Sequence, residues 1–222
     1  MAKPTRRRAV PRAVWWSLAA VVIMGLGAAF QLWQSSSQVM QPLEVSGVYL
    51  NKPQPVVDFT LVNDEGGAFT KAELQGKWTF IYFGYTSCPD VCPTTLALLN
   101  KAQQQLAGEE ADENTEYLLI SVDPDRDLPA RLKQYVSSFN PAFSGATGER
   151  EELDKLTKAL GVYYKIYPPE ADNEFYLVDH SSALLLINPA AELQAVLTPP
   201  FTPATLADDL KRIRERYNAI NS

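Results

Sequence analysis

The chain has 222 residues, 46% of them hydrophobic, and a formal net charge of −6. This length supports one folded domain beside an N-terminal segment that does not belong to the globular part. Five basic residues precede the first acid, Glu44, which leaves 15 basic against 26 acidic residues in the rest of the chain, a formal charge of −11. So acidic a chain offers no basic surface for phosphates, and we expect no nucleic-acid partner.

A basic segment, residues 1–13, is followed by twenty uncharged residues, 14–33. About 20 apolar residues in a helix match a hydrocarbon core about 30 Å thick. Tryptophans at both ends favour the membrane interface, and preceding basic residues favour a cytoplasmic N-terminus. We therefore expect residues 1–13 in the cytoplasm, residues 14–33 as a single-pass anchor in the cell inner membrane, and the remainder in the periplasm. The alternative is a cleaved signal peptide, which shares this order of basic, apolar and small residues.

The next segment, residues 34–55, is polar and contains prolines, which predicts a linker before a domain at 56–220. Alternating apolar residues on either side of 64–67 predict a β-hairpin at the start of that domain. From there, hydrophobic periodicity predicts strands and helices in alternation, which indicates the α/β class. The expected strands are 78–85, 116–122, a short one near Phe143, 162–167, 175–178, 183–187 and 193–197, and the expected helices are 93–106, 128–139, 151–160 and 203–217 with Thr202 as N-cap.

Both cysteines lie in one heptapeptide, SCPDVCP (87–93), between an expected strand and an expected helix. A helix N-terminus stabilises negative charge, so thiols there are expected to have a lowered pKa and to be good nucleophiles and metal ligands. A proline follows each cysteine, which predicts that Cys92 caps the helix and that Cys88 lies in the loop. Three intervening residues allow either a disulfide or two bonds to one metal ion. A purely stabilising disulfide is the alternative to a functional pair.

The only histidine, His180, stands just before the apolar run 183–187. In a thioredoxin-like sheet, the loop before this strand faces the cysteine loop and carries a cis-proline, and here Asp179, His180 and Ser181 occupy it. Two thiolates and an imidazole suit Cu(I), Cu(II) or zinc better than magnesium or calcium. Structural zinc usually takes four protein ligands, and the chain has no further cysteine or histidine, so copper is favoured. Alone, such a histidine is more often a capping or core-edge residue.

Over residues 56–217, the chain resembles the Sco/SenC family of copper-handling proteins. This resemblance implies a thioredoxin-like fold, with a central mixed sheet flanked by helices, an N-terminal hairpin and an N-terminal transmembrane helix. It also implies copper bound by Cys88, Cys92 and His180. The motifs that carry it are GKWTFIYFGYTSCPDVCPTT (76–95), ISVDPDRDLP (120–129), Thr147-Gly148, GVYY (161–164) and YLVDHSSALLLINP (176–189).

The resemblance further implies work on the CuA centre of cytochrome c oxidase, by delivering copper or by reducing the cysteines of that site. The implied partners are the oxidase subunit that carries CuA, other copper chaperones and thiol reductants. Asp123 matches a family acid near the metal, and we expect it to support the ligands or to face a partner, the alternative being a turn former at a strand end. Asp179 and Asp90 are weaker candidates.

Two further functions stay open from the sequence, although we expect a metallochaperone rather than an enzyme. A thiol-disulfide oxidoreductase would use Cys88 and Cys92 as a redox pair and would not need His180. Pairs of the thioredoxin kind usually have two intervening residues, not three. A peroxidase would use one cysteine beside a threonine and an arginine, an arrangement that the sequence does not show around either cysteine.

Overall fold

The computed structural model describes residues 16, 22–27, 30–31, 42–167 and 176–221. The chain divides into two compact units, Met1–Pro42 and Leu43–Ser222. Residues 22–27 and 30–31 of the first unit are helical, and most of the expected anchor, with the whole segment 1–13, lies outside the described residues. Among the residues that are described, we find no helix with the length and apolarity needed to cross a bilayer.

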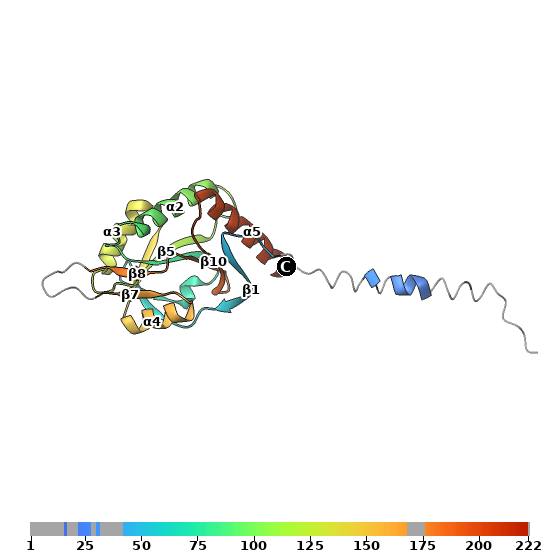
Figure 1. Cartoon of the computed structure of the whole chain (residues 1–222), viewed down its shortest axis with the longest axis horizontal. Helices are drawn as coiled ribbons and strands as arrows, with labels where there is room; N and C mark the ends of the chain where they lie inside the picture. The colour runs from blue at the N-terminus through green and yellow to red at the C-terminus, as the bar shows by residue number, and fades with distance from the viewer. Residues whose placement is uncertain (1–15, 17–21, 28–29, 32–41, 168–175, 222) are drawn as a thin grey trace, which may run out of the picture. The chain divides into compact units, whose positions relative to one another are not determined.

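The second unit is built on a mixed sheet of eight strands in the order β1-β10-β9-β4-β5-β6-β2-β3 (Figure 1). At its centre, β4 (Trp78–Gly84) runs parallel to β5 (Thr115–Ser121) and antiparallel to β9 (Leu184–Ile187). All residues of β4 and β9 are buried. Strands covered on both faces are expected to read as continuous apolar runs, which is how the sequence revealed them.

The outer strands lie on both sides of this centre. On one side, β6 (Ser144–Thr147) is parallel to β5, and the hairpin of β2 (Thr60–Asn63) and β3 (Ala68–Thr70) completes that edge before the short 3-10 helix η1 (Lys71–Leu74). The N-terminal hairpin expected from the sequence is therefore confirmed. On the other side, β10 (Glu192–Leu197) pairs with β9 and with β1 (Gly47–Pro55), both antiparallel.

Helices cover both faces of the sheet. Figure 1 shows α2 (Val91–Leu106), α3 (Pro129–Phe139) and α5 (Pro203–Asn221) on one face and α4 (Arg150–Ala159) on the other. The N-cap of α5 is Thr202 as expected, since its Oγ1 accepts the backbone N–H of Thr205 at 3.2 Å. A separate two-stranded sheet pairs β7 (Tyr164–Ile166) with β8 (Val178–His180).

Two expectations about the elements are wrong. Residues 47–55, expected as linker, form β1, an edge strand whose register with β10 is irregular between Tyr49 and Gln54. Edge strands tolerate prolines, and the prolines at 53 and 55 hide the alternation by which strands are found. The strand expected at 175–178 lies instead at 178–180, so His180 is its last residue and not part of a loop.

Candidate metal centre

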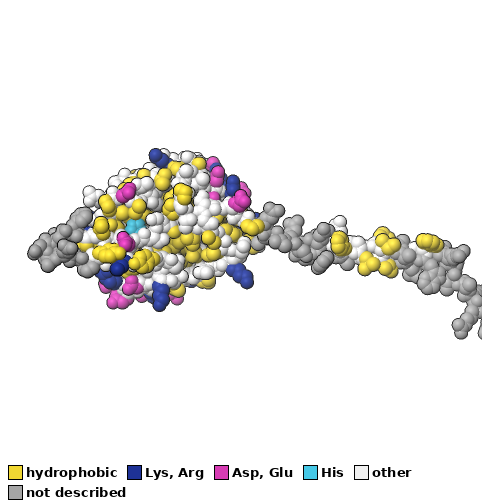
Figure 2. Space-filling view, viewed as in Figure 1, with side chains coloured by type: hydrophobic (Ala, Val, Ile, Leu, Met, Phe, Trp, Pro, Cys, Tyr) yellow, Lys and Arg dark blue, Asp and Glu magenta, His cyan; other side chains and the backbone are white. Residues whose placement is uncertain are grey.

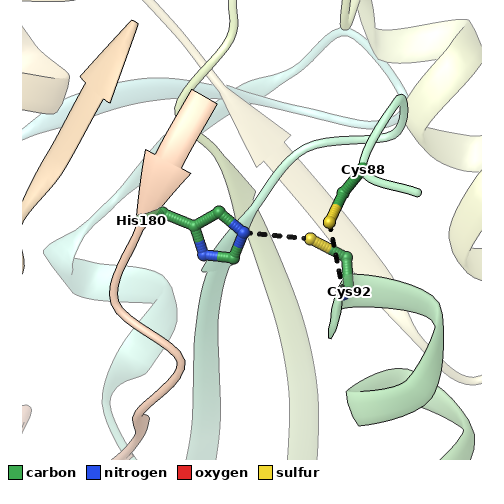
Figure 3. Close-up of side chains that lie close together, drawn as sticks. All are labelled: Cys88, Cys92 and His180. Carbon is green, nitrogen blue, oxygen red and sulfur yellow. Dashed lines mark hydrogen bonds between the residues drawn. The ribbon is translucent and has the colours of Figure 1, made fainter. Parts of the chain in front are cut away.

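Three side chains from separate elements meet at one end of the main sheet (Figure 3). Cys88 lies in the loop after β4, Cys92 in the first turn of α2, and His180 at the end of β8. Their sulfur and nitrogen atoms all lie within 4.8 Å of one another, and the Cys92 Sγ is 3.3 Å from the His180 Nε2. The structure therefore brings together the three residues that the sequence selected as metal ligands.

The start of α2 differs from the expectation that Cys92 caps the helix. Asp90 is the N-cap but makes no side-chain capping bond, and Cys92 lies within the helix. The backbone N–H of Cys92 donates instead to the Cys88 Sγ, at 3.4 Å. Pro93 is tolerated because N–H groups of the first turn have no partner within the helix. A backbone N–H at the positive end of the helix thus donates a hydrogen bond to the sulfur of Cys88.

Burial outweighs the helix N-terminus at Cys92. This side chain has no exposed surface, and desolvation raises the pKa of its thiol, so the expected lowering of the pKa is wrong for Cys92. Both cysteines are free, and Cys88 keeps 9% of its surface exposed. A metal ion bound here would have to displace the Cys92 proton.

His180 presents one nitrogen to the sulfurs. Its Nδ1 lies 3.1 Å from the carbonyl oxygen of Ser181, which can only accept, and this contact favours the tautomer with the proton on Nδ1 and a lone pair on Nε2. Burial lowers the pKa of His180, which keeps the ring neutral at neutral pH. The rings of Tyr82 and Tyr85 both meet the imidazole edge-on, with centroids 5.8 Å away. His180 is therefore held as a neutral nitrogen ligand.

Two residues of β4 shape the pocket around Cys92 and were not found from the sequence. The hydroxyl of Tyr82, which has no exposed surface, donates to the Cys92 Sγ at 3.8 Å, and burial raises the pKa of this hydroxyl. A Cβ on Gly84 would lie 2.9 Å from the same sulfur. Both positions lie in a strand whose residues are all buried. The sequence pattern therefore indicates that they are buried but not which atoms they contact.

Asp123 is buried and does not join the ligands. Its carboxylate accepts hydrogen bonds from the Arg126 Nε at 2.5 Å and the Tyr176 hydroxyl at 2.6 Å. The Arg126 guanidinium lies over the rings of Tyr176 and Tyr85, at 3.5 and 5.6 Å from their centroids. Since Tyr85 contacts His180, Asp123 reaches the ligands through two intervening side chains. With no exposed surface, its carboxylate does not face a partner in this structure.

The two weaker acidic candidates also stay outside the ligand set. Asp179 is exposed and accepts a hydrogen bond from the Tyr167 hydroxyl at 2.7 Å. Asp90, also exposed, serves only as the backbone N-cap of α2.

A fourth aspartate, Asp127, fixes the loop that carries Cys88. This fully buried carboxylate accepts from the Thr86 backbone N–H at 2.8 Å, the Thr86 Oγ1 at 2.5 Å and the Ser121 Oγ at 2.6 Å. The sequence offered one signal for this role, because Asp127 belongs to the motif ISVDPDRDLP. Its contact with a loop 41 residues earlier could be seen only in the structure.

An arginine and a threonine are hydrogen-bonded to each other at the loop that carries Cys88. The Arg131 Nε donates to the Thr86 Oγ1 at 2.7 Å, and its Nη2 donates to the Ser87 Oγ at 2.9 Å. Among the described residues, neither side chain hydrogen-bonds the Cys88 sulfur, which accepts from the Cys92 backbone. Arg131 and Thr86 therefore stabilise the loop that carries Cys88.

The fold and the site together define a class: a thioredoxin-like α/β domain in which two cysteines and one histidine form a potential metal site. A model of the SCO1/SenC family matches residues 47–215, and the chain belongs to this family.

Comparisons with individual proteins agree with this assignment. The mitochondrial SCO2 homolog of Bos taurus is 33% identical over 163 residues, which are 73% of this chain and 61% of that protein, so the chain spans about three fifths of that relative's length. The structure of Arabidopsis thaliana ScoI with copper bound has 34% identity and a TM-score of 0.66, covering 72% of this chain and 98% of that one. Copper-bound ScoI of Bradyrhizobium japonicum has 35% identity and a TM-score of 0.64, covering 72% and 99%.

Proposed function

We propose that this protein binds one copper ion through Cys88, Cys92 and His180, and that it delivers the copper to the CuA site of cytochrome c oxidase or reduces the cysteines of that site. The observation that carries the proposal is the convergence of two sulfurs and a lone-pair nitrogen within 4.8 Å. Thiolates and imidazole are ligands that copper prefers. Family members with the same fold have been solved with copper bound.

The arrangement suits release of copper as well as binding. Three protein ligands leave a coordination position that a ligand of a partner can enter. Cys92 has no exposed surface, whereas Cys88 lies in a loop and keeps 9% of its surface exposed, and His180 is half-buried. The chain's only histidine also comes to the surface among hydrophobic side chains (Figure 2). We infer that exchange with a partner's ligands begins at Cys88 or His180 and reaches the buried Cys92 last.

The proposal also includes the location and partners. The basic segment 1–13 and the uncharged stretch 14–33 support a single-pass anchor in the inner membrane, with the domain in the periplasm. The partners would be the oxidase subunit that carries CuA, the chaperones that supply copper, and reductants that keep both cysteines as thiols.

Copper titration of the full chain under reducing, anaerobic conditions tests the proposal. Wild-type protein should take up one copper, and His180→Ala should bind it at least about tenfold more weakly. In cells without the wild-type gene, the wild-type chain should restore oxidase activity and His180→Ala should not. If His180→Ala restores activity fully while Cys88→Ser and Cys92→Ser do not, the protein acts as a thiol-disulfide oxidoreductase and the copper function is wrong.

A further inference from the structure

Tyr82 lies behind the metal centre and touches two of its three ligands. Its hydroxyl donates to the Cys92 Sγ at 3.8 Å, and its ring meets the His180 imidazole edge-on. We propose that Tyr82 is a positioning residue whose hydroxyl hydrogen-bonds the copper-bound Cys92 sulfur and thereby sets both the affinity for copper and the balance between Cu(I) and Cu(II). This inference rests on the copper site proposed above.

The position of Tyr82 is fixed by the most buried part of the sheet. In β4 it pairs with Leu119 of β5 on one side and with Leu184 of β9 on the other, and its side chain has no exposed surface. A buried hydroxyl that loses its partner costs about 1–3 kcal/mol, so the bond to the sulfur is expected to persist. Tyr82 therefore offers the sulfur a donor that water does not compete for.

The two sulfurs receive different donors. The Cys88 Sγ accepts the backbone N–H of Cys92, whereas the Cys92 Sγ accepts the Tyr82 phenol in addition to a backbone hydrogen bond from Tyr85. A hydrogen bond to a metal-bound thiolate draws electron density away from the sulfur, which disfavours Cu(II) relative to Cu(I). Because this donor is a side chain, a single substitution of Tyr82 can remove its hydrogen bond to the Cys92 sulfur.

The neighbouring Tyr85 shows that contact with the histidine is separable from contact with the sulfur. Its ring meets His180 with the same centroid distance as that of Tyr82, 5.8 Å. However, the Tyr85 hydroxyl accepts the backbone N–H of Val178, at 3.4 Å. Of the two tyrosines beside the imidazole, Tyr82 is the one whose hydroxyl bonds to a ligand sulfur in the described structure.

The test replaces Tyr82 by phenylalanine in the full chain, which keeps the ring against His180 and removes the hydroxyl. The Cu(I) dissociation constant, measured by competition with a chromophoric chelator, should rise about tenfold. If the affinity for Cu(II) is unchanged, the reduction potential of the bound copper falls by about 59 mV, because a tenfold change in the Cu(I) dissociation constant corresponds to about 59 mV for one electron. The sulfur-to-copper charge-transfer band of the Cu(II) form should move to longer wavelength.

Tyr117→Phe is the matched control. Tyr117 lies in the adjacent strand β5, is almost fully buried, and its hydroxyl has no hydrogen-bond partner among the described residues. Its removal should leave the copper affinity and the charge-transfer band unchanged. A similar shift in both variants would show a general effect of removing buried hydroxyls, and would overturn the role of Tyr82.

A second arm covers the case in which Tyr82→Phe does not fold. Biosynthetic replacement of tyrosine by 3-fluorotyrosine keeps the ring and makes the phenol a stronger donor, so the band should move to shorter wavelength. A shift in the other direction, or none, contradicts the inference. Copper uptake by the wild-type protein distinguishes failure of the proposed function from failure of this inference. If the wild-type protein takes up no copper, both the proposed function and the inference are wrong. If uptake succeeds but Tyr82→Phe leaves affinity and spectrum unchanged, only the inference is wrong.

Discussion

Cys92 has no exposed surface, whereas Cys88 keeps 9% of its surface open to solvent. Burial therefore raises the pKa of the Cys92 thiol, although the residue lies in the first turn of a helix. Burial also lowers the pKa of His180, so the ring is already neutral at neutral pH and need not lose a proton when it binds a metal. Of Cys92 and His180, Cys92 is the one that must give up a proton when copper binds.

This difference predicts the pH dependence of copper binding. Because the raised pKa keeps Cys92 protonated at neutral pH, each copper bound displaces that proton, and binding strengthens as pH rises. The Cu(I) affinity should increase by at least about tenfold per pH unit between about pH 6 and 8, since one proton corresponds to a factor of ten. Competition titrations at several pH values measure this slope. A flat profile would mean that Cys92 is already a thiolate in the free protein.

Asp127 is predicted to stabilise the Cys88 loop. Asp127→Ala leaves the half-buried Thr86 and the buried Ser121 without their acceptor, and should lower the free energy of unfolding by about 3 kcal/mol. Denaturant titration measures the loss. Asp125→Ala is the control, because that side chain is 68% exposed and forms only a surface ion pair with Arg150, so its loss should cost less than about 1 kcal/mol. Equal losses would contradict the role given to Asp127.

The ligands could be predicted from the sequence because cysteine and histidine are scarce in this chain and carry their chemistry in the residue type. The residues that hold them could not. Tyr82 and Gly84 look like ordinary members of a buried strand, and Asp127 like a turn residue, because their roles depend on contacts across the fold.

At the scale of elements, the end of β4 and the start of α2 form the inner wall of the site. Gly84 is the last residue of β4, and a Cβ there would lie 2.9 Å from the Cys92 Sγ and 3.1 Å from the Tyr82 ring. The absence of a side chain thus lets the helix approach the strand closely enough for the hydroxyl of Tyr82 to reach the sulfur.

Gly84→Ala should therefore weaken copper binding by about tenfold and lower the free energy of unfolding by about 2 kcal/mol. Gly145→Ala separates the two effects. A Cβ at Gly145 would be crowded by the Leu132 Cβ at 3.1 Å, away from the ligands, so this variant should lose stability and keep its copper affinity. Unfolding curves and copper competition on both proteins provide the comparison. Equal copper affinities in the two variants would show that the Gly84 contact is not what places Cys92.

Elements with a strong period or a continuous apolar run were predicted well, and those near the site less so. The strands β4 and β9 were found because they are buried throughout. The short strand β8 was placed three residues too early, since a strand of three residues has almost no alternation to read. The edge strand β1 was missed because its prolines resemble a linker.

At the scale of the whole molecule, β1 sets where the domain begins. A chain that starts at Leu43 should fold and bind copper as the full chain does, because Leu43–Ser222 is a compact unit. A chain that starts at Val56 lacks β1, whose Tyr49 and Leu50 pack on the core and whose Leu50 carbonyl accepts the Gln194 side chain at 2.9 Å. It should lose about 3 kcal/mol of stability. Thermal and denaturant unfolding measure the stability of both truncated chains. Equal stabilities would show that residues 47–55 act as a linker and not as part of the domain.

The most direct test of the central claim is copper-edge X-ray absorption, with elemental analysis, on the full chain purified anaerobically. We predict one copper per chain, bound by two sulfurs and one imidazole nitrogen, with the nitrogen contribution lost in His180→Ala. A copper ion bound by sulfur alone, or a spectrum that His180→Ala leaves unchanged, would contradict the site described for this protein.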